Sequence, residues 1–235
     1  MGCNSSSPSS TPARRAGGAQ KEKVTFGYWN LRGSGRGNPA RYLLNYAKVQ
    51  YDEKTYIIGE DEWKNSKGNL GMDFPNLPYL ICDDFKISET LAVHQYIAAK
   101  FCPEILGKTA EDRANNYRLQ LIANEKMVEA LMTVFTQDDK SVTIAKFMEN
   151  MKGLVDHLGN KNFLSNAKIP CIADFILFEF MEFAQKVSGN AVYGTHPTLE
   201  AFHGRMSNLP GLKEYLASER HITTPYVPGF AKVQF

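Results

Sequence analysis

A glycine-rich turn at residues 33–37 is the first feature of the sequence whose composition suggests a ligand site. Turns of this kind cradle the phosphates of nucleotides where they join a strand to a helix. A G-x-G-x-x-G fingerprint that starts at Gly33 places Asn38 where the last glycine belongs, and the Gly-Lys-Ser/Thr of a P-loop does not follow. The turn therefore predicts a strand–turn–helix unit without a nucleotide site.

Two isolated side chains could also take part in chemistry. Tyr28 lies near the end of the β-branched and aromatic run at 24–29, where a phenol can donate a hydrogen bond to an anion. From the residues alone, an aromatic side chain that packs at a strand end is the favoured interpretation. Glu125 lies on a helical stripe of apolar residues, where an unpaired buried carboxylate is costly, so we expect it to contact water, a base or a ligand. The apolar members of this stripe are Tyr117, Leu121, Val128, Met132 and Phe135.

The composition excludes several classes of function. The net charge is +2, and the cations gathered near the N-terminus leave the remaining chain nearly neutral, which argues against nucleic-acid binding. The cysteines are far apart, without Cys-x-x-Cys pairs or His/Cys ligand spacing, which predicts a reducing compartment, no disulfide framework and no metal site. They are Cys3, Cys82, Cys102 and Cys171.

The N-terminal segment carries a modification motif. Residues 1–23 are rich in Ser, Pro, Gly and Ala, which predicts disorder, and they contain no apolar core of a secretory signal. The start fits the N-myristoylation pattern at Gly2, and Cys3 beside it is a candidate palmitoylation site. We therefore expect a cytoplasmic protein that is anchored to the cytoplasmic face of a membrane by acylation, with an unmodified leader as the alternative.

The elements that must position these groups begin with an α/β unit at 24–101. Asn38 suits a helix N-cap and Pro39 the first helical position, so a helix is expected directly after the glycine-rich turn. A second helix is expected over 89–100. Strands are expected at 24–29, 51–58, 79–82 and 86–88.

After a linker at 102–108 the strand pattern stops, and residues 109–235 are expected to form an all-helical domain with a C-terminal segment. A capping box at Thr109-x-x-Asp112 opens the first helix, and a second covers 141–158. The run at 175–181 is apolar almost all round, which predicts a central buried helix. Shorter helices are expected after Pro197 and Pro210.

Three segments resemble the cytosolic glutathione transferases of the mu class. They are the run Gly-Tyr-Trp-Asn-Leu-Arg-Gly at 27–33, the pair Trp63 and Lys67, and the run Leu-Gly-Met-Asp-Phe-Pro-Asn-Leu-Pro-Tyr-Leu at 70–80. The resemblance extends from residue 24 to about residue 230. It implies the glutathione transferase fold, an α/β thioredoxin-like N-terminal domain followed by an all-α C-terminal domain.

The resemblance also implies an enzyme that adds the sulfur of glutathione to electrophilic carbons of apolar compounds, as in detoxification. Glutathione is the co-substrate, and no cofactor is expected. A thiol with a pKa near 8.5 is only about 3% ionised at pH 7, so the site must favour the thiolate by roughly 2.7 kcal/mol to lower that pKa by two units. Tyr28 matches the family's catalytic tyrosine, whose O–H donates to the sulfur.

The remaining glutathione contacts are implied in the same way. Leu77, before a cis Pro78, would pair its backbone with the cysteinyl part, and Asn76 would reach the same peptide. Lys67 and the Trp63 indole would hold the glycine carboxylate. The full set of implied contacts is Trp29, Leu31, Trp63, Lys67, Asn76, Leu77, Pro78, Glu89 and Thr90, of which the last two would bind the γ-glutamyl end.

A homodimer is implied by two further positions. Phe74 matches an aromatic key that inserts into the partner subunit, and Glu125 matches an acid that reaches the partner's glutathione. Phe135 would line the electrophile pocket, at the position of a second tyrosine that assists some reactions. The sequence departs from the family in a turn about two residues longer at 33–40 and in a short acidic loop at 59–62.

Two other functions remain open at this stage. One is a protein of the same fold that binds apolar ligands or acts as a scaffold without turnover. The other is a glutathione-dependent isomerase or peroxidase. An intact Tyr28 together with Trp63, Lys67 and Glu89 favours catalysis over simple binding.

Overall fold

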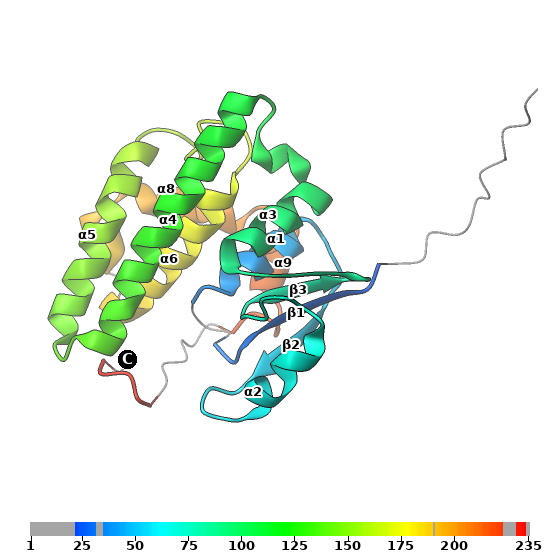
Figure 1. Cartoon of the computed structure of the whole chain (residues 1–235). Coiled ribbons are helices and arrows are strands. Elements are labelled where there is room, and N and C mark those ends of the chain that lie inside the picture. The colour runs from blue at the N-terminus through cyan, green and yellow to red at the C-terminus, as the bar shows by residue number, and fades with distance from the viewer. Residues whose placement is uncertain (1–21, 32–34, 190, 223–228, 234–235) are drawn as a thin grey trace, which may run out of the picture.

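A computed structural model describes residues 22–31, 35–189, 191–222 and 229–233. The candidate acylation positions Gly2 and Cys3 lie outside these residues. The fold class is the predicted one, a mixed α/β unit followed by helices (Figure 1).

The first half of the chain forms a four-stranded sheet in the order β2-β1-β3-β4. β1 is parallel to β2 and antiparallel to β3, and β4 is antiparallel to β3. The elements of this half are β1 (Val24–Trp29), α1 (Asn38–Tyr46), β2 (Asp52–Tyr56), α2 (Glu62–Ser66), the 3-10 helix η1 (Lys67–Leu70), β3 (Tyr79–Cys82), β4 (Phe85–Ser88) and α3 (Thr90–Phe101). The predicted order of strands and helices is therefore confirmed, with α2 and η1 as additions.

The second half is helical. A capping box formed by Thr109 and Asp112 opens its longest helix, as predicted, and Gly159 with a φ of 48° follows the second. Its elements are η2 (Pro103–Leu106), α4 (Ala110–Thr136), α5 (Lys140–Leu158), α6 (Ile172–Ser188), α7 (Ala191–Thr195), α8 (Thr198–Ser207) and α9 (Leu212–Leu216).

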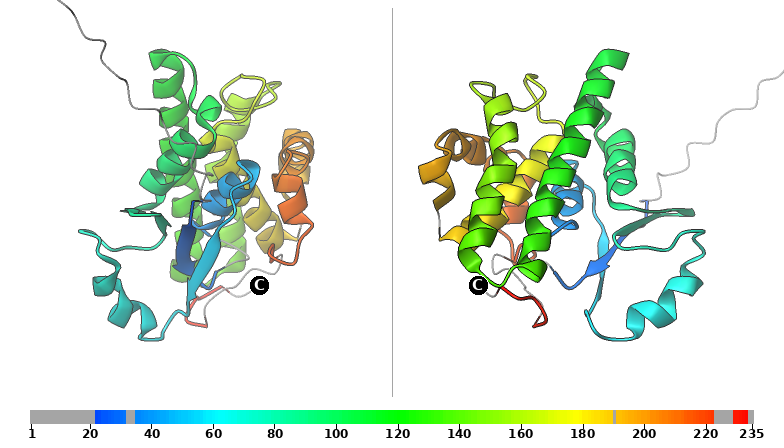
Figure 2. Two further views of the ribbon diagram at one scale, coloured as in Figure 1. Left: turned by 90° about the vertical axis from the view of Figure 1, so that its right-hand side faces the viewer. Right: turned by 60° about the vertical axis from the view of Figure 1, so that its left-hand side comes forward.

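The core lies where α6 meets its neighbours. α6 contacts α4 and α5 along its length and also α1, so it joins the helical half to the α/β half. Figure 1 shows α1 and α3 between the sheet and the long helices, and Figure 2 shows α2 apart from them, beyond the sheet. Nearly every residue of α6 is buried, which confirms the predicted central helix.

Most of the apolar stripe predicted on α4 does not face this core. Tyr117, Leu121 and Met132 are 46%, 40% and 50% exposed. The buried side of α4 is formed instead by Leu119, Ala123, Met127, Ala130 and Val134. The predicted helix is present, and Phe135 of its stripe packs against the core. Helical spacing identifies an apolar stripe without saying which neighbour covers it, and α4 carries two such stripes.

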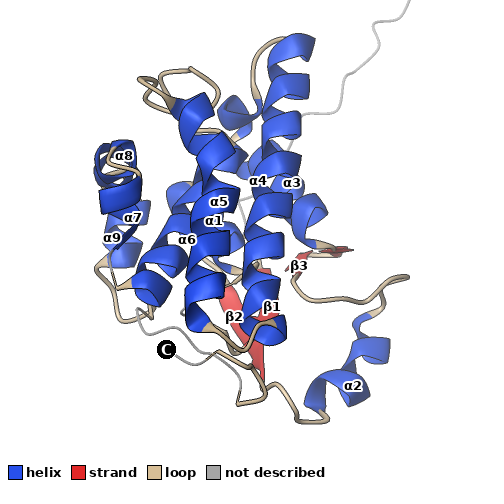
Figure 3. Ribbon diagram, turned by 90° about the vertical axis from the view of Figure 1, so that its left-hand side faces the viewer, coloured by secondary structure: helices blue, strands red, loops and turns tan. Residues whose placement is uncertain are grey.

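Figure 3 shows the helices in blue. No helix among the described residues is both long enough and apolar enough to cross a membrane.

Candidate functional site

The strand register gathers most of the predicted glutathione contacts at one end of the sheet. Gly27 on β1 pairs with Tyr79 on β3, so Tyr28 lies beside the start of β3, where Pro78 ends the preceding loop. Tyr79 in turn pairs with Ser88 on β4, which brings Glu89 to the same end. The parallel pairing of Trp29 with Tyr56 adds the segment that leads to α2. Residues spread over 62 positions of sequence are therefore neighbours in space.

Tyr28 is buried, with 5% of its surface exposed, beneath the turn that precedes α1. We call residues 35–37 the Gly35–Gly37 turn. A Cβ at Gly37 would lie 2.3 Å from Cδ1 of Tyr28, so only glycine lets the turn lie against the ring. Gly35 has a φ of 98°, and a Cβ there would lie 3.7 Å from the phenol oxygen. These two close approaches to Tyr28 explain why the turn is rich in glycine.

The backbone N–H of Arg36 lies near the Tyr28 oxygen and favours the ionised phenol. A phenol has one proton to donate and two lone pairs, so a backbone N–H directed at the oxygen leaves that proton available for a ligand. Burial raises the pKa of Tyr28, against the positive charges of Arg36 and Arg41. At neutral pH the phenol is therefore a neutral hydrogen-bond donor, as thiolate stabilisation requires.

The Arg41 guanidinium packs against the Tyr28 ring. It lies 5.4 Å from the centre of the Phe26 ring and 5.7 Å from that of Tyr28. It is held by Glu53, whose Oε1 accepts from Nε at 3.0 Å and from Nη2 at 2.6 Å. This pair fixes a positive charge near the phenol although it was not among the predicted site residues.

Trp63 and Lys67 lie in the segment that follows β2, Trp63 in α2 and Lys67 at the start of η1. Trp63 packs against three aromatic rings, with centroid distances of 6.3 Å to Trp29, 5.1 Å to Tyr56 and 6.3 Å to Tyr79. These contacts attach α2 to the sheet beside its edge strand β2. Lys67 follows one helical turn later and is exposed, and no ion-pair partner faces it among the residues that the structure describes.

The loop before β3 has the predicted backbone geometry. The Leu77–Pro78 bond is cis, as the resemblance implied. Asn76 joins this loop to the start of α3, because its Oδ1 accepts from Leu77 N–H at 2.9 Å and its Nδ2 donates to Glu89 Oε1 at 2.8 Å. Glu89 has a φ of 72°, a conformation that costs a non-glycine residue free energy and that is common at functional sites.

The other predicted positions are placed around this centre. Thr90 is buried at the first turn of α3, and Leu31 is half-buried after β1. The acidic loop at 59–62 pairs Glu62 with Lys54 on β2. Asn38 does not act as the predicted N-cap: its Nδ2 donates to Glu179 and its Oδ1 accepts from Arg41, so its side chain faces away from the helix start.

Glu179 on α6 is a residue of this site that sequence reasoning missed. It is 1% exposed, and its carboxylate accepts hydrogen bonds from Gly35, Asn38 and Tyr42. The signal was present, since Glu179 is the single charged residue in the apolar run at 175–181, and a buried carboxylate requires several donors.

Phe74 and Glu125 face outward. Phe74 is 81% exposed, and the Glu125 side chain is 66% exposed with Lys126 as its neighbour at 3.9 Å. Glu125 is therefore solvated rather than buried on an apolar stripe. Neither residue contacts the Tyr28 site within this chain.

Phe135 near the end of α4 contacts the C-terminal segment. Its ring stacks on Phe230 with a centroid distance of 5.9 Å, and Val233 N–H donates to the carbonyl of Val134 at 3.1 Å. Lys232 adds an ion pair with Asp138 at 3.1 Å. Residues 229–233 are thus attached to the end of α4, where the label of the C-terminus lies in Figure 1.

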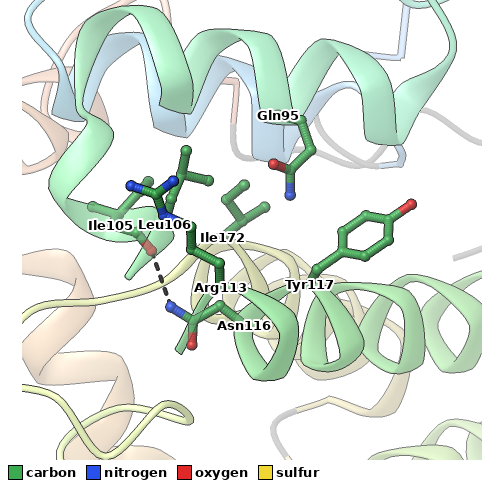
Figure 4. Close-up of a pocket in the computed structure, with 7 residues that line it drawn as sticks. All are labelled: Gln95, Ile105, Leu106, Arg113, Asn116, Tyr117 and Ile172. Carbon is green, nitrogen blue, oxygen red and sulfur yellow. Dashed lines mark hydrogen bonds between the residues drawn. The ribbon is translucent and has the colours of Figure 1, made fainter. Parts of the chain in front are cut away.

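A small cavity of about 70 Å³ lies away from this site, between α3, η2, α4 and the start of α6 (Figure 4). Ile105, Leu106 and Ile172 form its apolar floor, and Asn116 closes one side by donating to the Ile105 carbonyl at 3.4 Å. Tyr117, from the exposed stripe of α4, forms its rim. Its size suits water rather than a tripeptide.

One group of potential metal ligands occurs among the described residues. Atoms of Glu22, Cys82 and Asp83 lie within 4.8 Å of one another. Glu22 already pairs with Lys100 at 2.9 Å, and Asp83 accepts from Lys23 N–H at 2.9 Å. These contacts account for the group as the attachment of the chain start to the sheet.

Comparison with protein families divides the chain into two matching segments. Residues 24–99 match the model of the glutathione S-transferase N-terminal domain, and residues 121–219 match that of the glutathione S-transferase C-terminal domain.

Individual relatives agree with these matches. Glutathione S-transferase Mu 1 of Mus musculus is 31% identical over 214 residues, which cover 86% of this chain and 94% of that protein. The glutathione S-transferase class-mu 26 kDa isozyme of Schistosoma mansoni is 31% identical over 204 residues, which cover 85% and 91%. Among solved structures, the glutathione S-transferase Blo t 8 superimposes with a TM-score of 0.71 at 24% identity and covers 90% of this chain and 99% of its own.

Proposed function

Since the chain belongs to the glutathione S-transferase family and is similar to its mu-class members, we propose that it transfers the glutathione thiolate to electrophilic carbons of apolar compounds. The observation that carries the proposal is the Tyr28 phenol, which is buried at the end of β1 beneath the Gly35–Gly37 turn and is neutral at pH 7. Such a donor stabilises a sulfur anion where water is excluded. Detoxification is the corresponding physiological role.

In this mechanism glutathione binds along the end of the sheet. The Leu77 backbone pairs with its cysteinyl part, Lys67 and Trp63 hold the glycine carboxylate, and Glu89 holds the γ-glutamyl amino group. The Tyr28 O–H donates to the sulfur, so the thiol loses its proton to solvent and the thiolate attacks the electrophilic carbon. With an aryl halide, the new carbon–sulfur bond replaces the carbon–halogen bond and halide leaves. The electrophile lies toward Phe135 and Phe230, whose stacked rings offer an apolar surface.

The proposal is tested with the purified wild-type protein. We expect retention on immobilised glutathione and turnover of an aryl halide in a glutathione-dependent assay. Retention without turnover of aryl halides, peroxides or isomerisable substrates would favour a ligand-binding or scaffold protein. Failure to bind glutathione would exclude the transferase and the isomerase or peroxidase together.

Substitution of Lys67 by glutamine tests the carboxylate contact. The exposed ammonium of Lys67 has no competing ion-pair partner among the described residues, so its removal acts on the ligand alone. We expect the KM for glutathione to rise roughly tenfold with kcat nearly unchanged, as for loss of a charge-assisted hydrogen bond made equally in ground and transition states. Lys64→Gln, one turn earlier on α2 and also exposed, serves as the control. An equal effect of both variants would assign the change to surface charge.

The enzyme is proposed to act as a homodimer. Phe74 and the exposed α4 stripe leave large apolar side chains in water in the single chain, which is unfavourable unless a second surface covers them. Glu125 would then reach the glutathione of the partner subunit. The small cavity rimmed by Tyr117 lies beside this stripe.

The N-terminal motif supports a proposal of its own. Myristoylation at Gly2 and palmitoylation at Cys3 would supply the two acyl chains that stable anchoring needs, so the enzyme would work on the cytoplasmic face of a membrane. We expect Gly2→Ala to move the protein from the membrane fraction to the soluble fraction, and Cys3→Ser to leave a weaker, reversible association. Mass spectrometry of the wild-type N-terminus provides the direct measurement. An unmodified wild type that fractionates as soluble would contradict acylation.

A further inference from the structure

The buried carboxylate of Glu179 is unusual because it connects the helical half of the protein to the turn that covers Tyr28. Its Oε1 accepts from the backbone N–H of Gly35 at 2.8 Å. Its Oε2 accepts from Asn38 Nδ2 and from the Tyr42 hydroxyl, both at 2.9 Å. All three donors lie in the segment from the Gly35–Gly37 turn to the first turns of α1, more than 130 residues earlier in the chain.

The position of this turn decides what surrounds the phenol. Gly37 lies against the Tyr28 ring, and a Cβ at Gly35 would lie 3.7 Å from the Tyr28 oxygen. The hydrogen bond from Gly35 N–H to Glu179 therefore fixes the turn at the residue beside the phenol oxygen. A shift of the turn would therefore change both the orientation of Tyr28 and the strength of its O–H as a donor.

We propose that Glu179 is a positioning residue for glutathione activation: from α6 it holds the Gly35–Gly37 turn on Tyr28 and thereby aims the phenol proton at the sulfur. The inference rests on the proposed transferase function, because Glu179 has no contact with the substrate and acts only through Tyr28.

Hydrogen-bond chemistry explains why the position carries a carboxylate. Three donors face its two oxygens, so an amide in its place would direct an NH₂ group at a donor. Asn38 cannot turn its own oxygen toward that NH₂ without losing the bond that its Oδ1 accepts from Arg41 Nη1 at 2.6 Å. A glutamate therefore accepts all three hydrogen bonds, whereas a glutamine of nearly the same shape leaves at least one donor without an acceptor.

Loss of the negative charge of Glu179 and loss of its hold on the turn would shift the thiol pKa in opposite directions. The direction of the measured shift therefore distinguishes an effect of charge from an effect of positioning. The charged group that acts on Glu179 is Lys186 on its own helix, and the titratable but neutral hydroxyls of Tyr28 and Tyr42 lie near it. The negative charge of Glu179 raises the pKa of Tyr28. A negative charge near the site also disfavours a thiolate. If Glu179 acted through its charge alone, its neutralisation would lower the thiol pKa. Loss of the correct position of Tyr28 would instead raise the thiol pKa.

The experiment compares Glu179→Gln with the wild type by the pH dependence of thiolate absorbance of bound glutathione and by aryl-halide kinetics. We expect the thiol pKa to rise by about one unit and kcat/KM at neutral pH to fall about tenfold, since one unit is a factor of ten in thiolate. The same substitution in a Tyr28→Phe background should have little further effect, because the two residues act as one unit. Equal losses in both backgrounds, or a lower thiol pKa, would overturn the proposal.

Tyr42→Phe is the matched control. It removes one donor to the same Oε2 atom from α1 and leaves the Gly35 and Asn38 bonds in place, so stability should fall slightly while the thiol pKa stays near that of the wild type. If Glu179→Gln does not fold, Asn38→Ala removes the donor that directly follows the Gly35–Gly37 turn, whereas Tyr42 lies one helical turn further along α1. This variant is expected to raise the thiol pKa in the same direction. An unchanged thiol pKa in a folded Asn38→Ala protein would then count against the proposal.

The outcomes distinguish this inference from the function on which it rests. A wild type without turnover contradicts the transferase. An active wild type that requires Tyr28, together with a Glu179→Gln variant whose thiol pKa is unchanged, contradicts only the role of Glu179.

Discussion

Replacing Tyr28 with phenylalanine is expected to lower kcat/KM for an aryl halide roughly 100-fold at neutral pH, the usual cost of removing one hydrogen-bond donor from a developing or bound anion. The change removes a single oxygen from a ring that is packed by Gly37 and Arg41, so the ring and the fold should remain in place. Glutathione should still bind through its backbone and carboxylate contacts. The loss therefore appears in the reactivity of the sulfur.

The pH dependence makes this expectation specific. Without the phenol proton, the thiol pKa of bound glutathione should rise toward its ordinary value near 8.5, by about two units if Tyr28 supplies all the preference for the thiolate. The loss of activity should then shrink as pH rises above that pKa, because the unassisted thiol ionises by itself. Stopped-flow or spectrophotometric rates between pH 6 and 9 measure this, with pH values taken around the ordinary thiol pKa.

A second tyrosine serves as the control. Tyr51 packs edge-on against Phe26, and its hydroxyl accepts from Asn45 at 3.2 Å. Tyr51→Phe should retain wild-type kinetics. A Tyr28→Phe variant with wild-type rates and thiol pKa would remove the phenol from the mechanism.

Substitution of Phe74 by alanine is expected to weaken the proposed homodimer by about three to four orders of magnitude. Full burial of a phenylalanine side chain stabilises by roughly 2 to 3 kcal/mol, and a two-fold dimer buries two copies, which corresponds to roughly 4 to 6 kcal/mol. The side chain is 81% exposed in the single chain, so its truncation should leave the fold of the monomer almost unchanged. Analytical ultracentrifugation at a series of concentrations measures the dissociation constant.

The α4 stripe provides an independent variant for the same interface. Met132, at 50% exposed, is the most exposed of the large apolar residues on α4, and Met132→Lys should also favour the monomer. Phe230→Ala is the control, since that ring is 68% exposed but stacks on Phe135 near the proposed electrophile pocket. A protein that is monomeric before any substitution, or a dimer that tolerates both changes, would show that these surfaces are not the interface.

Short-range patterns in the sequence determined most of the elements. The β-branched run at 24–29, the capping box at Thr109 and Asp112 and the apolar run at 175–181 each specify local structure through backbone preference and side-chain period, and each is present as predicted. The segments at 27–33 and 70–80 were sufficient to recognise the family, and the cis bond before Pro78 followed from that recognition.

A sequence pattern was less informative where the same residues could contact either of two neighbours in the fold. The stripe with Tyr117 and Met132 has the same spacing as a core face, yet another face of α4 is buried against α6. Asn38 has the composition of a helix cap, yet a buried carboxylate offers it a stronger partner than the helix end does. In both cases a tertiary contact decides where the side chain points, and the spacing of residues in the sequence does not identify that contact.

The sequence by itself determined the strands, most of the helices, the family and the position of the phenol along the chain. Only the tertiary structure decided that Glu179 holds the turn above Tyr28, that Arg41 supports the ring, and which apolar stripe of α4 is left exposed. The physical reason is the range of the interactions. Helix and strand patterns repeat every few residues, whereas the Gly35–Glu179 hydrogen bond joins groups 144 positions apart and exists only once α6 has packed against α1.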